Sequence, residues 1–115
     1  MVNNPAVLDR GFLALSHPVR RAIVERLAAG PATVGEASRG LGITKPAVTK
    51  HLDVLEGAGV VSRTAVGRTR VLRLVPHPLD EVSDWLDFHR RLWEAKFEIV
   101  EHHLAKLNEN REVPK

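Results

Sequence analysis

The chain has 115 residues, which suits a single domain, and contains no cysteine, so disulfides, thiol-based sensing and thiolate metal sites are excluded. Its formal net charge is only +3, but residues 16–75 carry ten Lys or Arg against four Asp or Glu, whereas residues 76–115 carry six against nine. We therefore expect a polyanion to bind the middle of the chain, with the acidic C-terminal part facing away from it.

Two helices are predicted ahead of residue 30. The first spans residues 5–15, where apolar residues recur at helical spacing as Leu8, Phe12 and Leu15. Ser16 is predicted to cap the second helix, which ends before Gly30-Pro31. Within it, a solvated or salt-bridged role is favoured for Arg20 and Arg21 over a phosphate contact.

Residues 33–59 predict two short helices joined by a tight turn. Thr33 and Glu36 have the spacing of a capping box, which starts the first of these helices. Gly42 supplies the positive φ that ends it, and Thr44 caps the second helix. A short helix, a glycine-containing turn and a second helix form the helix-turn-helix arrangement.

The second of these helices has one apolar face and one polar, basic face. Val48, Leu52 and Leu55 occur at i, i+4 and i+7, so they are expected to be buried. The polar side chains near the start of the helix are Lys45, Thr49, Lys50 and Asp53. This division is typical of a helix that enters the major groove of DNA. An ordinary helical hairpin with solvated lysines is the alternative interpretation of the stretch.

Residues 60–75 predict a β-hairpin, or wing, that follows the helix-turn-helix. They are rich in β-branched residues and are divided by Gly67. The turn lacks a strong two-residue signature, so the sequence leaves the strand register open. Four arginines lie along this segment: Arg63, Arg68, Arg70 and Arg73.

Three segments together resemble the ArsR/SmtB family of small bacterial winged helix-turn-helix repressors. They are LSHPVRRAIVERLAAGP (residues 15–31), TVGEASRGLGITKPAVTKHLDVLEGAGVV (33–61) and GRTRVLRL (67–74). The resemblance covers roughly residues 5–107 and implies one mostly α winged helix-turn-helix domain of element order ααααββα. No nucleophile signature and no phosphate-cradling glycine loop is present, so we do not expect an enzyme.

The terminal helix predicted for residues 79–107 carries two apolar stripes. One consists of Leu79, Val82, Leu86, Trp93, Phe97, Val100, Leu104 and Leu107, and the other of Trp85, Phe88, Leu92 and Ile99. Because a surface helix needs only one stripe, two stripes indicate two partners. The second partner is expected to be the same helix of another copy, so that a two-fold homodimer forms through the terminal helices. The alternative is a helix buried within one monomer.

The resemblance also implies which residues meet DNA. Thr44, Lys45, Thr49, Lys50 and His51 match the contact region of the family's recognition helix. Thr44 and the helix N-terminus are expected to hold a phosphate, whereas Lys45, Thr49 and Lys50 are expected to reach base edges. His51 ranks lower, as either a phosphate contact or a partly buried residue.

Arg68 and Arg70 are expected to meet the DNA backbone or the minor groove through the wing. The expected function is therefore that of a dimeric repressor that binds a palindromic operator in double-stranded DNA. A winged helix used for protein–protein contact is the competing class. No apolar run has the length of a signal-peptide core or a membrane span, so we expect a cytoplasmic protein without membrane contact. The sequence identifies neither the operator, nor the regulated genes, nor an effector.

A metal-sensing repressor is the second alternative, because some members of the family bind metal on the terminal helix. Asp87 and His89 match the first half of that pattern. The family spacing then places a ligand at Val100, which cannot bind metal, although His103 falls at the last position. His102 is displaced by about 200° around the helix. We therefore assign no metal and no cofactor.

Overall fold

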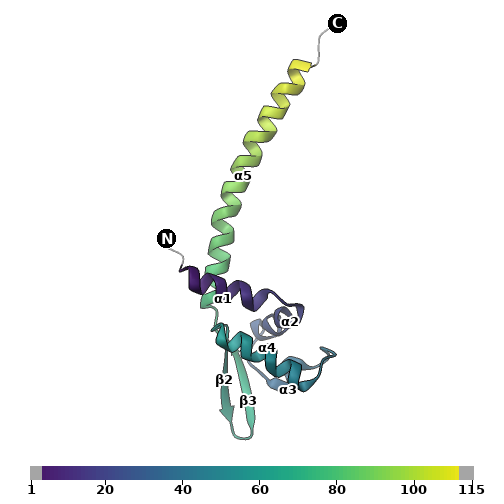
Figure 1. Cartoon of the computed structure of the whole chain (residues 1–115), viewed down its shortest axis with the longest axis vertical. Coiled ribbons are helices and arrows are strands. Elements are labelled where there is room, and N and C mark those ends of the chain that lie inside the picture. Colours follow the sequence, from purple (N-terminus) through teal and green to yellow (C-terminus); the bar gives the residue numbers. More distant parts are fainter. Residues whose placement is uncertain (1–3, 112–115) are drawn as a thin grey trace. The chain divides into compact units, whose positions relative to one another are not determined.

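The computed structural model describes residues 4–111, which form two compact units, residues 4–82 and residues 83–111 (Figure 1). The first unit is mostly α-helical with a small antiparallel sheet, which confirms the predicted winged helix-turn-helix fold. Its elements in chain order are α1 (Pro5–Leu15), α2 (Pro18–Ala28), β1 (Ala32–Thr33), α3 (Val34–Ser38), α4 (Lys45–Gly57), β2 (Val61–Val66) and β3 (Thr69–Leu74). The helix α5 (His77–Arg111) begins in the first unit and makes up the described part of the second.

The prediction that Ser16 caps α2 is wrong by one residue. The cap is His17, whose Nδ1 accepts a hydrogen bond from the backbone N–H of Val19 at 3.1 Å. Ser16 instead closes α1, because its Oγ donates to the carbonyl of Leu13 at 2.7 Å. His17 precedes Pro18, which forces it into the extended conformation that an N-cap requires.

The apolar residues that recur along α1 are only partly buried: Leu8 and Leu15 are half-buried, and Leu15 packs against the core. Gly11 and Ala14 are buried, whereas Phe12 is 40% exposed. A Cβ on Gly11 would lie 2.6 Å from the carbonyl oxygen of Pro78 and 2.5 Å from Cγ2 of Val82. The fully buried positions of α1 are its smallest residues, because α1 lies too close to the start of α5 for a larger side chain.

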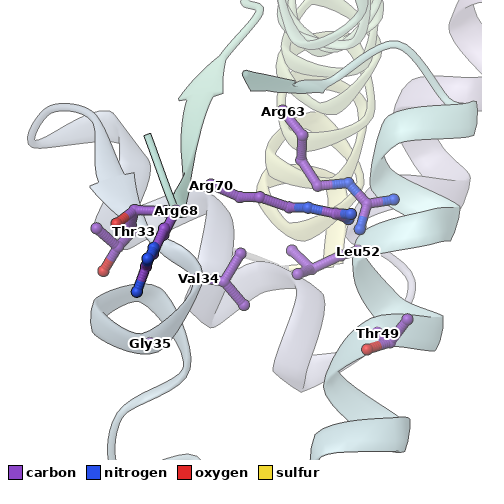
Figure 2. A pocket seen from close by; sticks show the side chains of 9 residues that line it. Thr33, Val34, Gly35, Thr49, Leu52, Arg63, Arg68 and Arg70 are labelled. Atoms are coloured by element: carbon purple, nitrogen blue, oxygen red, sulfur yellow. The ribbon is translucent and has the colours of Figure 1, made fainter. Parts of the chain in front are cut away.

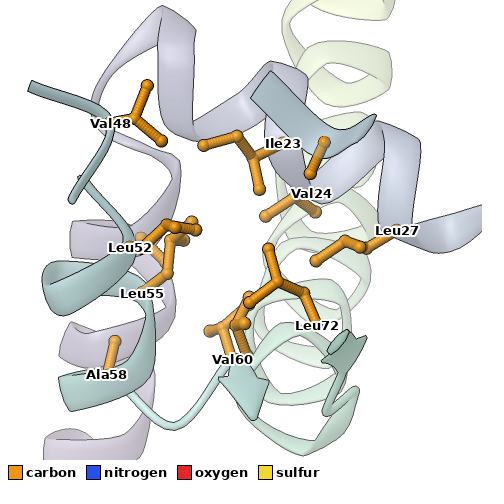
Figure 3. Close-up of a cluster of buried hydrophobic side chains, with 12 residues drawn as sticks. Ile23, Val24, Leu27, Val48, Leu52, Leu55, Ala58, Val60 and Leu72 are labelled. Carbon is orange, nitrogen blue, oxygen red and sulfur yellow. The ribbon is translucent and has the colours of Figure 1, made fainter. Parts of the chain in front are cut away.

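The core of the first unit lies between α2, α4 and the sheet (Figure 3). Its largest fully buried side chains are Ile23, Leu52, Leu55, Leu72 and Val60. The predicted stripe of α4, which includes Val48, is buried throughout. Each large aliphatic side chain buried in this way contributes roughly 1.5–3 kcal/mol relative to an exposed one. The apolar side of α4 therefore holds the helix in place and leaves its polar side outside.

The sheet has three strands in the order β1-β3-β2, of which the sequence predicted two. The additional strand is β1, which pairs antiparallel to β3 through Ala32↔Leu72 and Thr33↔Val71. Two residues are too few to show an alternating pattern, so this strand had no signal of its own.

The register of the wing, which the sequence left open, follows from its turn. Val66 pairs with Thr69, so β2 and β3 are joined by the two residues Gly67 and Arg68. Gly67 has a φ of 62°, and Arg68 has no positive φ. A positive φ at the first central position alone is the mark of a type II′ turn, whose twist suits a tight hairpin.

The helix α5 begins at His77, two residues before its predicted start, and continues past residue 107 to Arg111. Pro78 does not delay it, since a residue in the first turn needs no N–H partner. None of the helices within residues 4–111 combines the length and apolar character that crossing a membrane requires. Large apolar side chains of both stripes are exposed in the second unit: Leu86, Phe88, Leu92, Trp93, Phe97, Ile99, Val100, Leu104 and Leu107.

Candidate nucleic-acid interface

The first helix of the helix-turn-helix, α3, starts as predicted but ends earlier. The Thr33 hydroxyl accepts from the N–H of Glu36, and the Glu36 carboxylate accepts from the N–H of Thr33, both at 3.1 Å. The hydrogen bond from the Thr33 backbone lowers the pKa of the Glu36 carboxyl. The helix ends at Ser38, and both Gly40 and Gly42 adopt a positive φ in the turn that follows. The predicted role of Gly42 is thus shared with Gly40.

The second helix, α4, presents its polar face to solvent from its first turn. Thr44 is the N-cap, and its Oγ1 accepts from the N–H of Ala47 at 3.3 Å. The side chains of Lys45, Thr49 and Lys50 are exposed. Four of the five residues predicted to meet DNA on this helix are therefore accessible to a ligand.

A groove of about 440 Å³ runs between α3, α4 and the wing, and we call it the basic groove (Figure 2). It is lined by Thr33, Val34, Gly35, Thr49, Leu52, Arg63, Arg68, Thr69 and Arg70. Thr49, Arg68 and Arg70 were all predicted DNA contacts, and the fold brings them to one hollow. Lys45 lines a neighbouring hollow, which also includes Thr49. Thr49 thus lies where the two hollows meet.

The three arginines of the basic groove are in two different states. Within residues 4–111, no ion pair joins Arg68 or Arg70 to a carboxylate, and both side chains are exposed. Arg63 of β2 is instead paired with two carboxylates of α4, Asp53 and Glu56, each at 2.7 Å. The hydrogen bond from Arg63 lowers the pKa of the Glu56 carboxyl, and the charge of Arg70 lowers it further.

His51 is half-buried, unlike the other predicted contact residues of α4. Its Nδ1 lies 3.2 Å from Nη1 of Arg20, and its ring centroid lies 4.2 Å from that of His17. Burial lowers the pKa of His51 most, and the charges of His17 and Arg20 lower it further. Since arginine can only donate, Nδ1 of His51 accepts and its proton is held on Nε2.

Among the described residues, Arg20 is neither solvated nor salt-bridged, which contradicts the prediction. It is 8% exposed, and its Nε donates to the carbonyl of Ala14 at 3.2 Å. Its Nη2 donates to the carbonyl of Leu13 at 2.9 Å and to Oγ of Ser16 at 2.7 Å. The guanidinium thus satisfies carbonyls at the C-terminus of α1 that have no partner within the helix. Spacing along the sequence carried no signal for these contacts.

Comparison with known proteins decides the family. Residues 15–64 match a model described as a helix-turn-helix domain. The chain is 46% identical over 85 residues to the HTH-type transcriptional regulator Rv2034 of Mycobacterium tuberculosis, covering 74% of this chain and 77% of that protein. It also superposes on the crystal structure of the ArsR family transcriptional regulator RHA00566 with a TM-score of 0.73 and 36% identity, covering 82% of this chain and 97% of that one. The chain belongs to the ArsR/SmtB family.

This ArsR/SmtB protein is therefore a DNA-binding transcriptional regulator and not an enzyme, as the sequence predicted. A further relative is the transcriptional repressor SdpR of Bacillus subtilis, which is 32% identical over 79 residues, covering 69% of this chain and 88% of that protein. The resemblance found in the three sequence segments is thus confirmed.

The half-matched metal pattern of this ArsR/SmtB regulator lies in the second unit. Asp87 is paired with Arg90 at 3.3 Å, and the His89 ring lies 4.2 Å from that of Trp85 and 6.1 Å from that of Trp93. Among residues 4–111, no three His, Asp or Glu side chains come together in a way that could hold a metal ion.

Proposed function

We propose that this regulator is a homodimeric repressor that binds a palindromic operator through the polar face of α4 and the basic groove. The observation that carries the proposal is the meeting of Thr49 with Arg68 and Arg70 around one open groove beside an exposed recognition helix. The Bacillus subtilis relative carries the name of a transcriptional repressor. A dimer that covers a promoter is the simplest way for a chain of this size to repress.

Each residue of α4 has a role in this proposal that its chemistry supports. Thr44 accepts from Ala47, so its hydroxyl proton remains available to a phosphate oxygen beside the helix N-terminus. Lys45, Thr49 and Lys50 reach the edges of bases in the major groove. Their exposure on one side of the helix leaves them free to do so.

The remaining contacts are made to the DNA backbone. Arg68 and Arg70 bind phosphates or enter the minor groove, since neither is neutralised by an ion pair within residues 4–111. His51 is the weakest contact of the set. Its Nδ1 is occupied by Arg20, so only the Nε2 proton can be donated to a phosphate.

The dimer forms through the terminal helix, residues 79–107, of a single domain that spans residues 5–107. The proposed seam consists of apolar side chains that are 42–66% exposed in the single chain: Leu86, Trp93, Phe97, Val100, Leu104 and Leu107. A second copy of the helix would bury this stripe around a two-fold axis. The dimer would also supply a second recognition helix, about 34 Å from the first, for the next major groove.

The experiment that tests the proposal combines selection of bound genomic fragments with sedimentation of the purified protein. We expect a dimer that selects a palindrome. Leu104→Glu should abolish the dimer and specific binding together, because burying a carboxylate in the seam costs several kcal/mol.

Two outcomes would contradict the proposal. A monomeric wild type would remove the seam, and failure to bind any duplex DNA at low salt would favour a protein–protein module. Adding a chelator or zinc distinguishes the proposed repressor from the metal-sensing alternative. The proposed repressor stays dimeric and bound in both conditions, whereas zinc-triggered release that Asp87→Ala abolishes would establish a metal sensor.

A further inference from the structure

Arg63 is the only arginine of the basic groove, within the described residues, that is bound to the recognition helix. Its Nη2 donates to Oδ1 of Asp53 at 2.7 Å, and its Nε donates to Oε2 of Glu56 at 2.7 Å. A longer bond of 3.4 Å joins Nη2 to Oε1 of Glu56. Figure 2 shows the side chain of Arg63 reaching from the wing towards α4. We call these three residues the clamp.

The clamp lies beside the residues that read DNA. Thr49, Asp53 and Glu56 stand at i, i+4 and i+7 of α4, so they share one face of the helix. The clamp as a unit carries one positive and two negative charges, which repels a phosphate rather than binding it. Arg63 is also only 17% exposed in its side chain, whereas Asp53 is 59% and Glu56 is 44% exposed. The charge and burial of Arg63 therefore argue against a direct DNA contact.

The clamp also lies close to the point where the three-stranded sheet continues as the two-stranded wing. β1 pairs only with Leu72 and Val71 of β3, which are the partners of Arg63 and Thr64 in β2. Beyond Thr64 the wing is a two-stranded ribbon, an arrangement that is marginally stable alone. Arg63 thus joins the end of the three-stranded sheet to α4, immediately before the ribbon that carries Arg68 and Arg70.

We propose that Arg63 is a positioning residue, whose bonds to Asp53 and Glu56 set the place of the wing relative to the recognition helix and so enforce discrimination of the operator. This inference rests on the proposed function of α4 and the wing in DNA binding. The clamp holds Arg68 and Arg70 where phosphates lie when Thr49 and Lys50 meet the correct bases. Without the clamp, the wing binds phosphates in several positions, and the affinities for operator and for random DNA become more similar.

The first test compares Arg63→Gln with the matched control Arg73→Gln. Arg73 is exposed and pairs with Ser62, one residue along from Arg63, so its side chain lies on the opposite face of the sheet. We expect Arg63→Gln to lower operator affinity about tenfold more than affinity for a scrambled duplex, which falls only because Asp53 and Glu56 are no longer neutralised, while the slope of log K against log salt stays as in wild type. Arg73→Gln should leave the ratio of the two affinities unchanged. Arg63→Lys, which keeps one charged donor, should restore part of the ratio.

The second variant releases Arg63 without removing it. Asp53→Asn combined with Glu56→Gln should raise affinity for the scrambled duplex and steepen the salt dependence, because a free arginine joins the groove. The operator-to-scrambled ratio should nevertheless fall, as in Arg63→Gln. A slope reduced by roughly 0.9 per contact in Arg63→Gln would show Arg63 to be a phosphate contact, and would overturn the proposal.

The position of the wing can be measured without DNA. Because the chain has no cysteine, Gly57→Cys in α4 and Val66→Cys near the wing tip can be spin-labelled selectively, in samples diluted with unlabelled protein. The distribution of label distances should broaden in Arg63→Gln and stay narrow in Arg73→Gln. An unchanged distribution in Arg63→Gln overturns the clamp. If wild type binds no duplex DNA, the proposed function fails, and the label distances still decide whether the clamp positions the wing.

Discussion

Arg20 and Arg68 show how one residue type serves opposite ends of the first unit. Arg20 lies buried at the junction of α1 and α2, where every donor group faces a carbonyl, a hydroxyl or an imidazole of the same chain. Arg68 lies exposed at the wing turn, without an ion pair in the described part of the chain. The comparison shows that the fold neutralises some positive charges and leaves others free, and under the proposed function only the free ones contact DNA.

The largest expected effect comes from removing the satisfied arginine. Arg20→Met should lower the free energy of unfolding by about 3 kcal/mol, because the buried carbonyl of Ala14 loses its side-chain donor and the partly buried bonds to Leu13, Ser16 and His51 are lost with it. Denaturant unfolding followed by circular dichroism measures this loss. The slope of DNA affinity against salt should be unchanged for the folded fraction. A reduced slope would mean that Arg20 reaches a phosphate, and the comparison would fail.

Removing the unsatisfied arginines should have the converse effect. Arg68→Gln together with Arg70→Gln should weaken specific and non-specific binding alike, by roughly 60-fold at about 0.1 M salt, since two phosphate contacts at 0.9 each correspond to that factor. The free energy of unfolding should change by less than about 0.5 kcal/mol, because both side chains are exposed. Gel-shift titrations over a range of salt concentrations measure the DNA affinities, and denaturant unfolding measures the free energy of unfolding. A constant slope would mean that the wing does not touch DNA.

Lys50 sharpens the comparison on the recognition helix itself. Lys50→Ala should cost about 1–2 kcal/mol of operator binding and relax discrimination at one base position, with little effect on folding because the side chain is exposed. Binding to a set of operators with single base changes measures this. Equal loss on every sequence would assign Lys50 to a phosphate, and no loss would remove it from the interface.

His51 is the intermediate case, and its effect should be the smallest. Its pKa is lowered in the folded state, so the stability that neutral His51 provides is fully present above the unfolded pKa of about 6.5 and is lost as pH falls from that value through the lower pKa of the folded state. Stability should thus decrease between about pH 7 and pH 5, and the decrease should be smaller in His51→Gln. Titration of the imidazole by NMR checks the direction, and a midpoint at or above 6.5 would contradict it.

Local hydrogen bonding is what made much of the helix-turn-helix predictable. The capping box of Thr33 with Glu36 and the cap at Thr44 involve groups no more than three residues apart, so their spacing alone identified both helix starts. His17 was missed because a histidine cap is chemically unusual, although Pro18 demanded an extended residue before it.

Contacts between distant segments could not be predicted from the sequence. Arg63 meets Asp53 and Glu56 from ten and seven residues away and across a change from helix to strand. Arg20 meets His51 over 31 residues. In both cases the choice between a free and a satisfied charge depends on tertiary structure. Two carboxylates at i and i+3 of the recognition helix, Asp53 and Glu56, were the one hint to the clamp that the sequence offered.

Because the wing closes in a two-residue turn, its length can change only in discrete steps. Gly67 and Arg68 close the hairpin with every residue of β2 paired in β3, so lengthening the wing requires one more residue in each strand. One added pair would extend the tip by about 3.4 Å but turn its side chains to the opposite face, whereas two pairs would extend it by about 7 Å and restore the face. Relatives whose wing contacts DNA at a longer or shorter reach should therefore differ from this chain by an even number of residues in each wing strand.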